Sequence, residues 1–143
     1  MPTIFNASDR VRVMHRVPVK AGDILRVAGV QGNHMLTEPA SPGQCEGKLW
    51  VAQHDAPGLS EVAHSADAVG FVLPWMVYNK GVDTREAQIG DPVFLDLNGK
   101  RTLQRGVGCR KVGHVVAVGF PSVHENGEPG CGAILLAPND QQG

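Results

Sequence analysis

The stretch that decides the fold is IGDPVFLDLNGK, residues 89–100. Gly90-Asp91 opens an apolar run and Asn98-Gly99 closes it, which predicts a turn, a strand over 92–97 and a hairpin. Asn and Gly best tolerate the positive φ angles of a type I′ turn, so this turn is expected at 98–99. A second stretch, VKAGDILRV at 19–27, begins in the same way with Gly22-Asp23.

The two Gly-Asp pairs indicate a device that starts a strand after a corner. Glycine supplies the unusual backbone angle, and the aspartate side chain is expected to accept a hydrogen bond from an amide two residues further on. Gly22-Asp23 and Gly90-Asp91 are then corners of one barrel, conceivably in its two halves. Ordinary turn chemistry explains two short matches more simply than an internal duplication does.

The other apolar runs are short and are bounded by glycine or proline, which is typical of an antiparallel sandwich or barrel. Further strands are expected at 10–17, 24–30, 49–54, 70–77, 100–105, 112–118 and 131–136. Pro74 makes its run an edge strand or splits it in two, and Gly29 indicates a bulge. Residues 31–47 are expected to form a long loop, and Ser60–Ala63 one helical turn. The predicted fold is all-β: a small antiparallel β-barrel or jelly-roll-like sandwich with an N-terminal arm and long loops.

Length and charge restrict the function. The 143 residues suit one domain, and the net charge of -1 gives no basic field for nucleic acid or an anionic membrane. No apolar run approaches the roughly 20 residues that span a bilayer, and MPTIFNASDR does not have the pattern of a signal peptide. Three cysteines without a CxxC pair favour reduced thiols in a cytoplasmic protein.

Motifs for catalysis or metal binding are weak. The six histidines include no HxH or HxxxH pair, and His54-Asp55 with His64 is the nearest approach to a ligand set. Cys109, beside Arg110 and Lys111, is the most plausible reactive cysteine. The glycine-rich stretches miss the phosphate-binding spacings, and no carboxylate pair stands out as acid and base. We therefore predict no enzyme activity, no catalytic or metal-binding residues and no cofactor.

Aromatic and apolar anchors gather at Pro74-Trp75-Met76-Val77-Tyr78. The simpler interpretation is a core or cross-strand cluster. The alternative is a subunit interface, because Trp and Tyr are enriched there and the segment is an expected sheet edge. We place the oligomer interface at Trp75, Met76, Val77 and Tyr78 as a hypothesis.

The sequence resembles a family of small decoration, or cement, proteins encoded in the head modules of tailed phages. The matching features, over residues 18–137, are Lys-Ala-Gly-Asp, Gly-Phe-Val-Leu-Pro, Ile-Gly-Asp-Pro-Val-Phe-Leu-Asp, the Asn-Gly hairpin, Val-Gly-His-Val-Val-Ala-Val-Gly and the final Ala-Ile-Leu-Leu. The long loops 31–47 and 120–130 depart from the pattern. The resemblance implies a non-catalytic barrel, made in the bacterial host cytoplasm, that binds the outside of the expanded capsid. Its partners would be the major capsid protein and itself, as a homotrimer or homodimer, with no nucleic acid and no membrane.

The expected organisation is an arm and first strand at 1–17, a decoration domain at 18–138 and a polar tail at 139–143. Capsid contacts are expected on the arm, because it is short and polar and carries large apolar side chains. The expected contact residues are Thr3, Ile4, Phe5, Arg10 and Arg12. The alternative is a non-catalytic β-domain for a small ligand or carbohydrate, since Lys20–Ile24 is similar to the entry of an antifreeze-like domain. That function would need an exposed Trp50 or Trp75.

Overall fold

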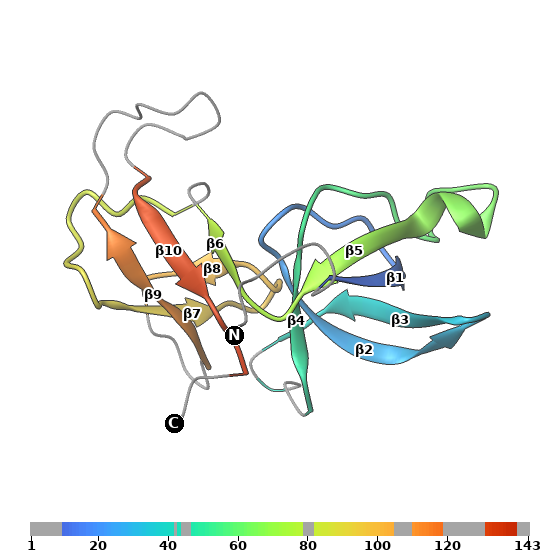
Figure 1. Cartoon of the computed structure of the whole chain (residues 1–143), viewed down its shortest axis with the longest axis horizontal. Helices are drawn as coiled ribbons and strands as arrows, with labels where there is room; N and C mark the ends of the chain where they lie inside the picture. Colours follow the sequence, from blue (N-terminus) through green and yellow to red (C-terminus); the bar gives the residue numbers. More distant parts are fainter. Residues whose placement is uncertain are drawn as a thin grey trace, which may run out of the picture.

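The computed structural model describes residues 10–41, 43, 47–78, 82–104, 110–118 and 131–139, and its strands form two five-stranded sheets that lie side by side (Figure 1). The first sheet is a closed barrel of β1 (Val11–His15), β2 (Ile24–Gln31), β3 (His34–Pro39), β4 (Leu49–Ala52) and β5 (Val69–Leu73). The second is open and contains β6 (Met76–Tyr78), β7 (Pro92–Leu95), β8 (Arg101–Thr102), β9 (Lys111–Ala117) and β10 (Ala133–Leu136). The predicted class, a small all-β barrel protein, is confirmed.

The second sheet repeats the strand pairing of the first. In the first sheet, β2 pairs with β3 and β4, β4 with β5, and β5 with β1. In the second, β7 pairs with β8 and β9, β9 with β10, and β10 with β6. All of these pairs are antiparallel. The difference is one seam. In the first sheet β1 also pairs in parallel with β3 and closes the barrel, whereas the equivalent β6 and β8 are the outer strands of the second sheet.

The Gly-Asp pairs occupy equivalent places in this repeat. Residues 20–23 and 88–91 form the same turn, in which glycine has a φ of 87° or 96°. In both, the aspartate carboxylate accepts a hydrogen bond from the N–H of the turn's first residue, at 2.9 Å. The prediction of an acceptor role was therefore right. The expected donor, an amide two residues on, was wrong, because the chain folds back and brings the preceding amide closer.

Matching hydrogen bonds attach each turn to its sheet. The glycine N–H donates to the carbonyl of Ala52 in one sheet and of Val115 in the other, both at 2.8 Å. The same two residues donate their N–H to the aspartate carbonyls, both at 2.9 Å. The Gly-Asp pair thus sets where the second strand starts in two copies of one arrangement. This answers why the sequence uses it twice.

Two apolar clusters hold the sheets, and β4 contributes to both because its side chains alternate between its two faces. Trp50 and Ala52 point into the barrel, where they pack with Val13, Val19, Leu25 and Val72. Leu49 and Val51 point the other way, into a larger cluster shared with the second sheet. Its other buried members are Ile24, Ala40, Val82, Val93, Leu95, Val112, Val115, Ile134 and Leu136. The larger cluster therefore joins the two sheets into one molecule.

Proline and glycine act as predicted at two points. Pro74 splits its apolar run, so that β5 belongs to the barrel and β6 to the second sheet. The missing N–H and fixed φ of proline suit a point where the chain leaves one ladder and enters another. The β2–β3 register shifts between Val27 and Gly29, which is the predicted bulge.

The loop predicted for residues 31–47 was wrong in its first half. β3 (His34–Pro39) forms a hairpin with β2, in the register Gln31 with His34, and Gly32 turns with a φ of 60°. The polar composition of this stretch concealed the strand, because β3 buries only Leu36 and Thr37 fully. Ser60–Ala63 is likewise no helical turn, and the short 3₁₀ helix η3 lies instead at Ser65–Ala68.

The hairpin after β7 is not of type I′, because no described residue other than glycine has a positive φ. It has a three-residue loop: Asp96 donates its N–H to the carbonyl of Lys100 at 2.9 Å, and Gly99 has a φ of 79°. The Asp96 carboxylate accepts hydrogen bonds from the backbone N–H groups of Asn98 and Lys100, at 2.8 and 3.0 Å. This carboxylate favours the longer loop, which has a glycine bulge. The strand predicted at 100–105 is correspondingly short, since β8 is only Arg101–Thr102.

Candidate functional site

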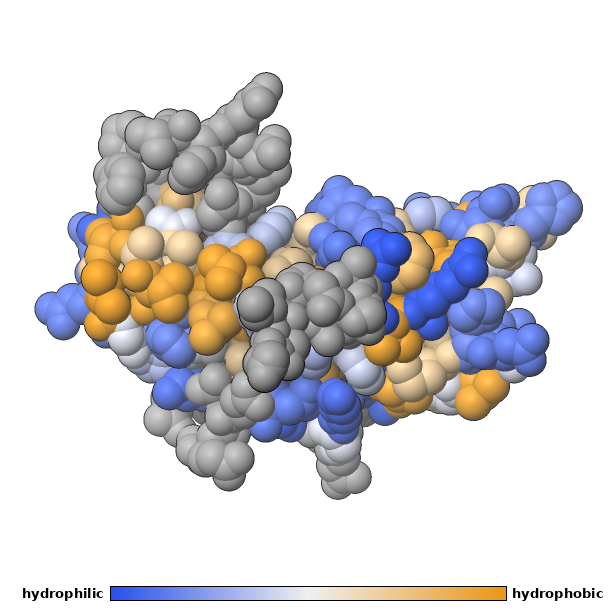
Figure 2. Space-filling view, in the orientation of Figure 1, coloured by the Kyte–Doolittle hydropathy of each residue, from blue (hydrophilic) through white to orange (hydrophobic). Residues whose placement is uncertain are grey.

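Four arginines lie on the outside of the barrel, around β1. We call them, together with the ring that supports one of them, the arginine face: Arg10, Arg12, Arg16, Arg26 and Phe71. Alternation places them there, because Val13 and its inward neighbours fill the barrel. Strongly hydrophilic surface gathers over β1 and β5 in Figure 2.

Arg10 and Arg12 flank one aromatic ring. The Arg10 guanidinium carbon lies 4.1 Å from the centroid of the Phe71 ring, and Arg12 is opposite Phe71 in the β1–β5 pair. His54 approaches the same ring edge-on, with centroids 6.1 Å apart and planes inclined at 64°. Neither arginine forms an ion pair with a described residue. The ring therefore holds a charged group in place without neutralising it.

The other two arginines share one acid. Arg16 Nη1 lies 3.0 Å from Glu38 Oε1, and Arg26 forms an ion pair with the other oxygen of the same carboxylate. Glu38 is mostly buried beneath them, whereas the Arg16 side chain is largely exposed. One carboxylate cannot neutralise two guanidinium groups, so this end of the arginine face also keeps a positive charge.

The outward side of the second sheet carries an apolar patch instead. Val77 and Leu135 are cross-strand neighbours in β6 and β10. On β9, His114 pairs with Leu135, and Val116 lies two residues further along the strand. Val77 is 54% exposed and Val116 38%. We call Val77, Leu135 and Val116 the apolar face. In Figure 2, hydrophobic surface gathers over β9 and β10.

The residues predicted for an oligomer interface divide between two sides of β6. Met76 and Tyr78 pack against the cluster that joins the sheets, and the Tyr78 ring covers Gly22, where an added Cβ would lie 2.9 Å from it. Val77 points outward with the apolar face. Trp75, at the crossing between the sheets, is 37% exposed. Met76 and Tyr78 therefore pack against the interior, whereas Trp75 and Val77 are exposed at the surface.

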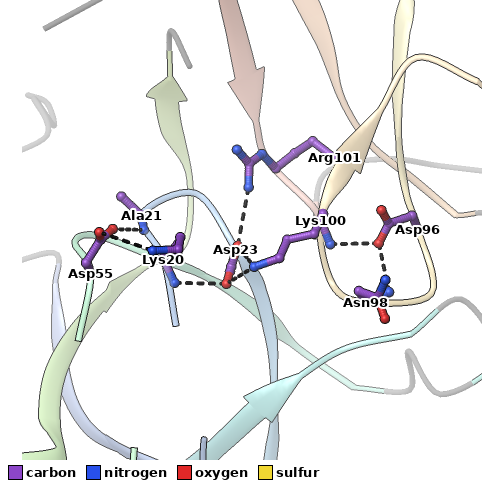
Figure 3. A network of polar contacts seen from close by, with 8 residues as sticks. All are labelled: Lys20, Ala21, Asp23, Asp55, Asp96, Asn98, Lys100 and Arg101. Atoms are coloured by element: carbon purple, nitrogen blue, oxygen red, sulfur yellow. Dashed lines mark hydrogen bonds and ion pairs between the residues drawn. The ribbon is translucent and has the colours of Figure 1, made fainter. Parts of the chain in front are cut away.

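A buried carboxylate ties the two sheets together. Asp23 immediately precedes β2 and is 1% exposed. Its carboxylate accepts hydrogen bonds from Lys100 Nζ at 2.7 and 2.8 Å and from Arg101 Nη1 at 3.3 Å (Figure 3). Both cations belong to the second sheet's hairpin. The hairpin also accepts a hydrogen bond from the barrel: the N–H of Ile24 donates to the carbonyl of Gly99 at 2.9 Å. These bonds keep the two outward faces in a fixed relation.

Asn139, the last residue that the structure describes, holds the end of the second sheet's chain to the barrel. Its Oδ1 accepts from the N–H of Leu49 and its Nδ2 donates to the same residue's carbonyl, both at 2.8 Å. The predicted polar tail therefore begins with a side chain that pairs with β4 like a short strand.

His15 closes the parallel seam between β1 and β3. Its Nδ1 is 2.7 Å from Thr37 Oγ1, and its side chain is fully buried. Burial, reinforced by the charge of His54 and opposed by Asp23, lowers the pKa of His15 from 6.5 to about 4. A positively charged imidazole is disfavoured there because water cannot solvate it. At neutral pH the seam therefore contains a neutral histidine.

Groups for other chemistry are sparse in the part of the chain that the structure describes. No three His, Cys, Asp or Glu side chains there are placed to hold a metal ion. A polar hollow is lined by Asp83, Arg85 and Glu86. Hydrogen bonds from Arg85 lower the pKa of Asp83 to about 2, so this carboxylate stays charged and paired. None of the described helices is long and apolar enough to cross a membrane.

Some predicted residues lie outside the described ranges: Thr3, Ile4 and Phe5 of the arm, and also Cys45 and Cys109. Arg10 and Arg12 are described and stand on the arginine face. Sequence reasoning missed the role of Phe71 as a support for Arg10. It also missed Asp23 as the tie between the sheets, although the repeated Gly-Asp pair marked the position. Trp50 is only 8% exposed and packs inside the barrel.

No family model, curated protein or solved structure matches the chain.

Proposed function

We propose that the protein is a non-catalytic capsid decoration protein of a tailed phage. In this role it binds the outer surface of the expanded head, bridges neighbouring major capsid subunits and stabilises the shell against internal DNA pressure. The observation that carries the proposal is the pair of unlike outward faces on one braced scaffold. The arginine face suits a polar lattice, and the apolar face suits a second copy of the chain.

The internal repeat supports this interpretation. The same strand arrangement presents Arg12 beside Phe71 in the first sheet and Val77 beside Leu135 in the second. Since one fold carries both kinds of surface, folding alone requires neither of them. The two faces are better explained by two different contacts, one with the capsid and one with another copy.

The contacts between the two sheets suit a protein that must resist mechanical stress on the capsid. The sheets are joined by the larger apolar cluster and by the buried Asp23 ion pairs, and such contacts favour a rigid connection between the two faces. A repeating lattice then adds many modest contacts into strong overall attachment.

The carbohydrate-binding alternative has less support. An exposed tryptophan was expected to stack on the sugar, and Trp50 is buried. Of the two tryptophans, Trp75 has the larger exposed surface, and none of the described residues that line the polar hollow at Asp83 is aromatic.

A stabilisation assay tests the proposal. Mature, undecorated phage heads are heated with and without the protein, and the temperature at which they release DNA is measured with an intercalating dye. We expect the release temperature to rise in a saturable way. Unchanged release temperature at every protein concentration would refute the cement role.

A further inference from the structure

We propose that the arginine face binds a carboxylate-rich segment of a partner protein, with Arg10 and Arg12 supplying the ion pairs. This deepens the proposed function and rests on it for the location of the partner, which is the capsid shell. The chemistry of the partner, clustered Asp and Glu side chains, follows from the arginine face itself.

Arg10 is prepared for such a contact. Its guanidinium carbon lies 4.1 Å from the centroid of the Phe71 ring, and the guanidinium forms no ion pair with a described residue. A long side chain already held in place loses less rotamer freedom on binding than a free one. A guanidinium over an aromatic ring can still bind a carboxylate through its two-pronged set of N–H donors.

Arg12, in β1, provides the second contact two residues after Arg10, which immediately precedes the strand. Arg12 lies opposite Phe71 in the β1–β5 ladder, and Arg10 contacts the ring of the same Phe71, so the two arginines lie on one side of the barrel wall. An extended acidic segment has the same two-residue repeat. Alternate carboxylates of such a segment can therefore meet both arginines at once.

The positive charge of the arginine face favours a negatively charged partner. The arginine face contains four guanidinium groups, and the ion pairs within it use one carboxylate, that of Glu38. The whole chain nevertheless has a net charge of -1. A positive patch on a protein of this net charge is a local feature, which attracts local negative charge.

Protein carboxylates fit this patch better than nucleic acid does. Single-stranded nucleic acid is usually bound by stacking bases on open aromatic rings. Here Arg10 covers the face of Phe71, and His54 meets its edge.

The test measures the anisotropy of a fluorescein-labelled oligoglutamate peptide titrated with the full-length protein. An oligoglutamine of the same length and a labelled DNA oligonucleotide are titrated in parallel. We expect the oligoglutamate to bind, more tightly at low salt, and the oligoglutamine not to bind. Absence of oligoglutamate binding, or tighter binding of the DNA, would overturn the inference.

Variants place the binding on the arginine face. R10Q/R12Q should weaken oligoglutamate binding about tenfold or more, since two charge-assisted contacts are lost. The matched control K20Q/R85Q removes two exposed cations elsewhere and should leave binding within about twofold. Equal binding by R10Q/R12Q and the wild type, at equal thermal stability, would contradict the assignment.

A conservative change separates stacking from charge. R10K keeps the charge and loses the planar group over Phe71, so binding should fall between that of the wild type and that of R10Q. If R10K binds as the wild type does, Phe71 does not position Arg10. Binding of oligoglutamate without binding to heads would sink the proposed function and leave this inference intact.

Discussion

At the scale of single residues, Asp23 shows how one side chain can serve two levels of structure. Its counterpart Asp91 makes the same turn bond to a backbone amide at 2.9 Å, but Asp23 is also surrounded by two cations from the other sheet. The same residue type in the same turn is thus a local cap in one copy and a tie between sheets in the other.

This contrast predicts unequal costs. Asp23→Asn leaves Lys100 and Arg101 without their buried carboxylate and should lower the free energy of unfolding by about 3 kcal/mol. Asp91→Asn, the matched control, weakens one turn bond and should cost about 1 kcal/mol. Urea denaturation followed by tryptophan fluorescence measures both. Equal losses for the two variants would show that the tie between the sheets contributes nothing.

His15 gives the protein a pH dependence of stability. Its folded-state pKa, about 4, lies below the value of 6.5 expected for an unfolded chain. The unfolded state therefore binds more protons between these values, and this contribution to stability is lost as the pH falls from 6.5 towards 4. From pH 7.5 to pH 5 the loss should be about 2 kcal/mol.

Denaturation curves at these two pH values check the prediction for His15. The variant His15→Gln should be less stable at pH 7.5, because it disturbs the bond to Thr37, but it should lose less stability on acidification than the wild type does. If both proteins lose the same amount, other groups cause the pH dependence.

At the scale of elements, some strands need glycine because their neighbours approach too closely for a side chain. At Gly113 in β9, an added Cβ would lie 1.9 Å from the carbonyl oxygen of Leu135 in β10. Gly113→Ala should therefore separate the two strands and cost about 3 kcal/mol.

The control for this element is Gly43→Ala, where nothing lies within 4 Å of the added Cβ and φ is not positive. Its effect on stability should stay within about 0.5 kcal/mol. Thermal unfolding followed by far-UV circular dichroism compares the two variants. A Gly113→Ala protein as stable as Gly43→Ala would contradict the described β9–β10 packing.

The sequence predicted several elements whose position is decided by single proline and glycine residues. Pro74 ended β5, Gly29 marked the bulge, and the Gly-Asp pairs placed the starts of β2 and β7. It failed for β3, which has a polar pattern and depends on pairing with β2, and for the 96–100 hairpin, where the Asp96 carboxylate selects the loop. The tie from Asp23 to Lys100 could not be predicted either, since it joins residues 77 apart in the chain.

At the scale of the whole molecule, the repeat explains how one chain presents two kinds of surface. The first five strands close into a barrel with an outward positive charge, and the next five form an open sheet with an outward apolar side. Of the predicted sites, the arginines and Val77 stand on these surfaces, whereas Tyr78 packs inside. Side chains alternate between inward and outward along β6, but this alternation could be assigned only once the first and last residues of the strand were known.

Self-association through the apolar face is testable with one charge. Val77→Glu places a carboxylate at its centre and should convert the proposed homo-oligomer to monomer, because burying an unpaired charge is costly. The control Leu97→Glu changes another exposed apolar residue, at the hairpin tip, and should leave the oligomer intact. Sedimentation velocity measures the mass. A monomeric wild type, or an oligomer insensitive to Val77→Glu, would contradict the proposed interface.

The most direct test of the capsid proposal is co-sedimentation of the purified protein with undecorated phage heads, both expanded and unexpanded. The account predicts saturable binding to expanded heads alone, weakened by R10Q/R12Q and unaffected by K20Q/R85Q. Failure of the folded protein to sediment with either form of head would contradict it.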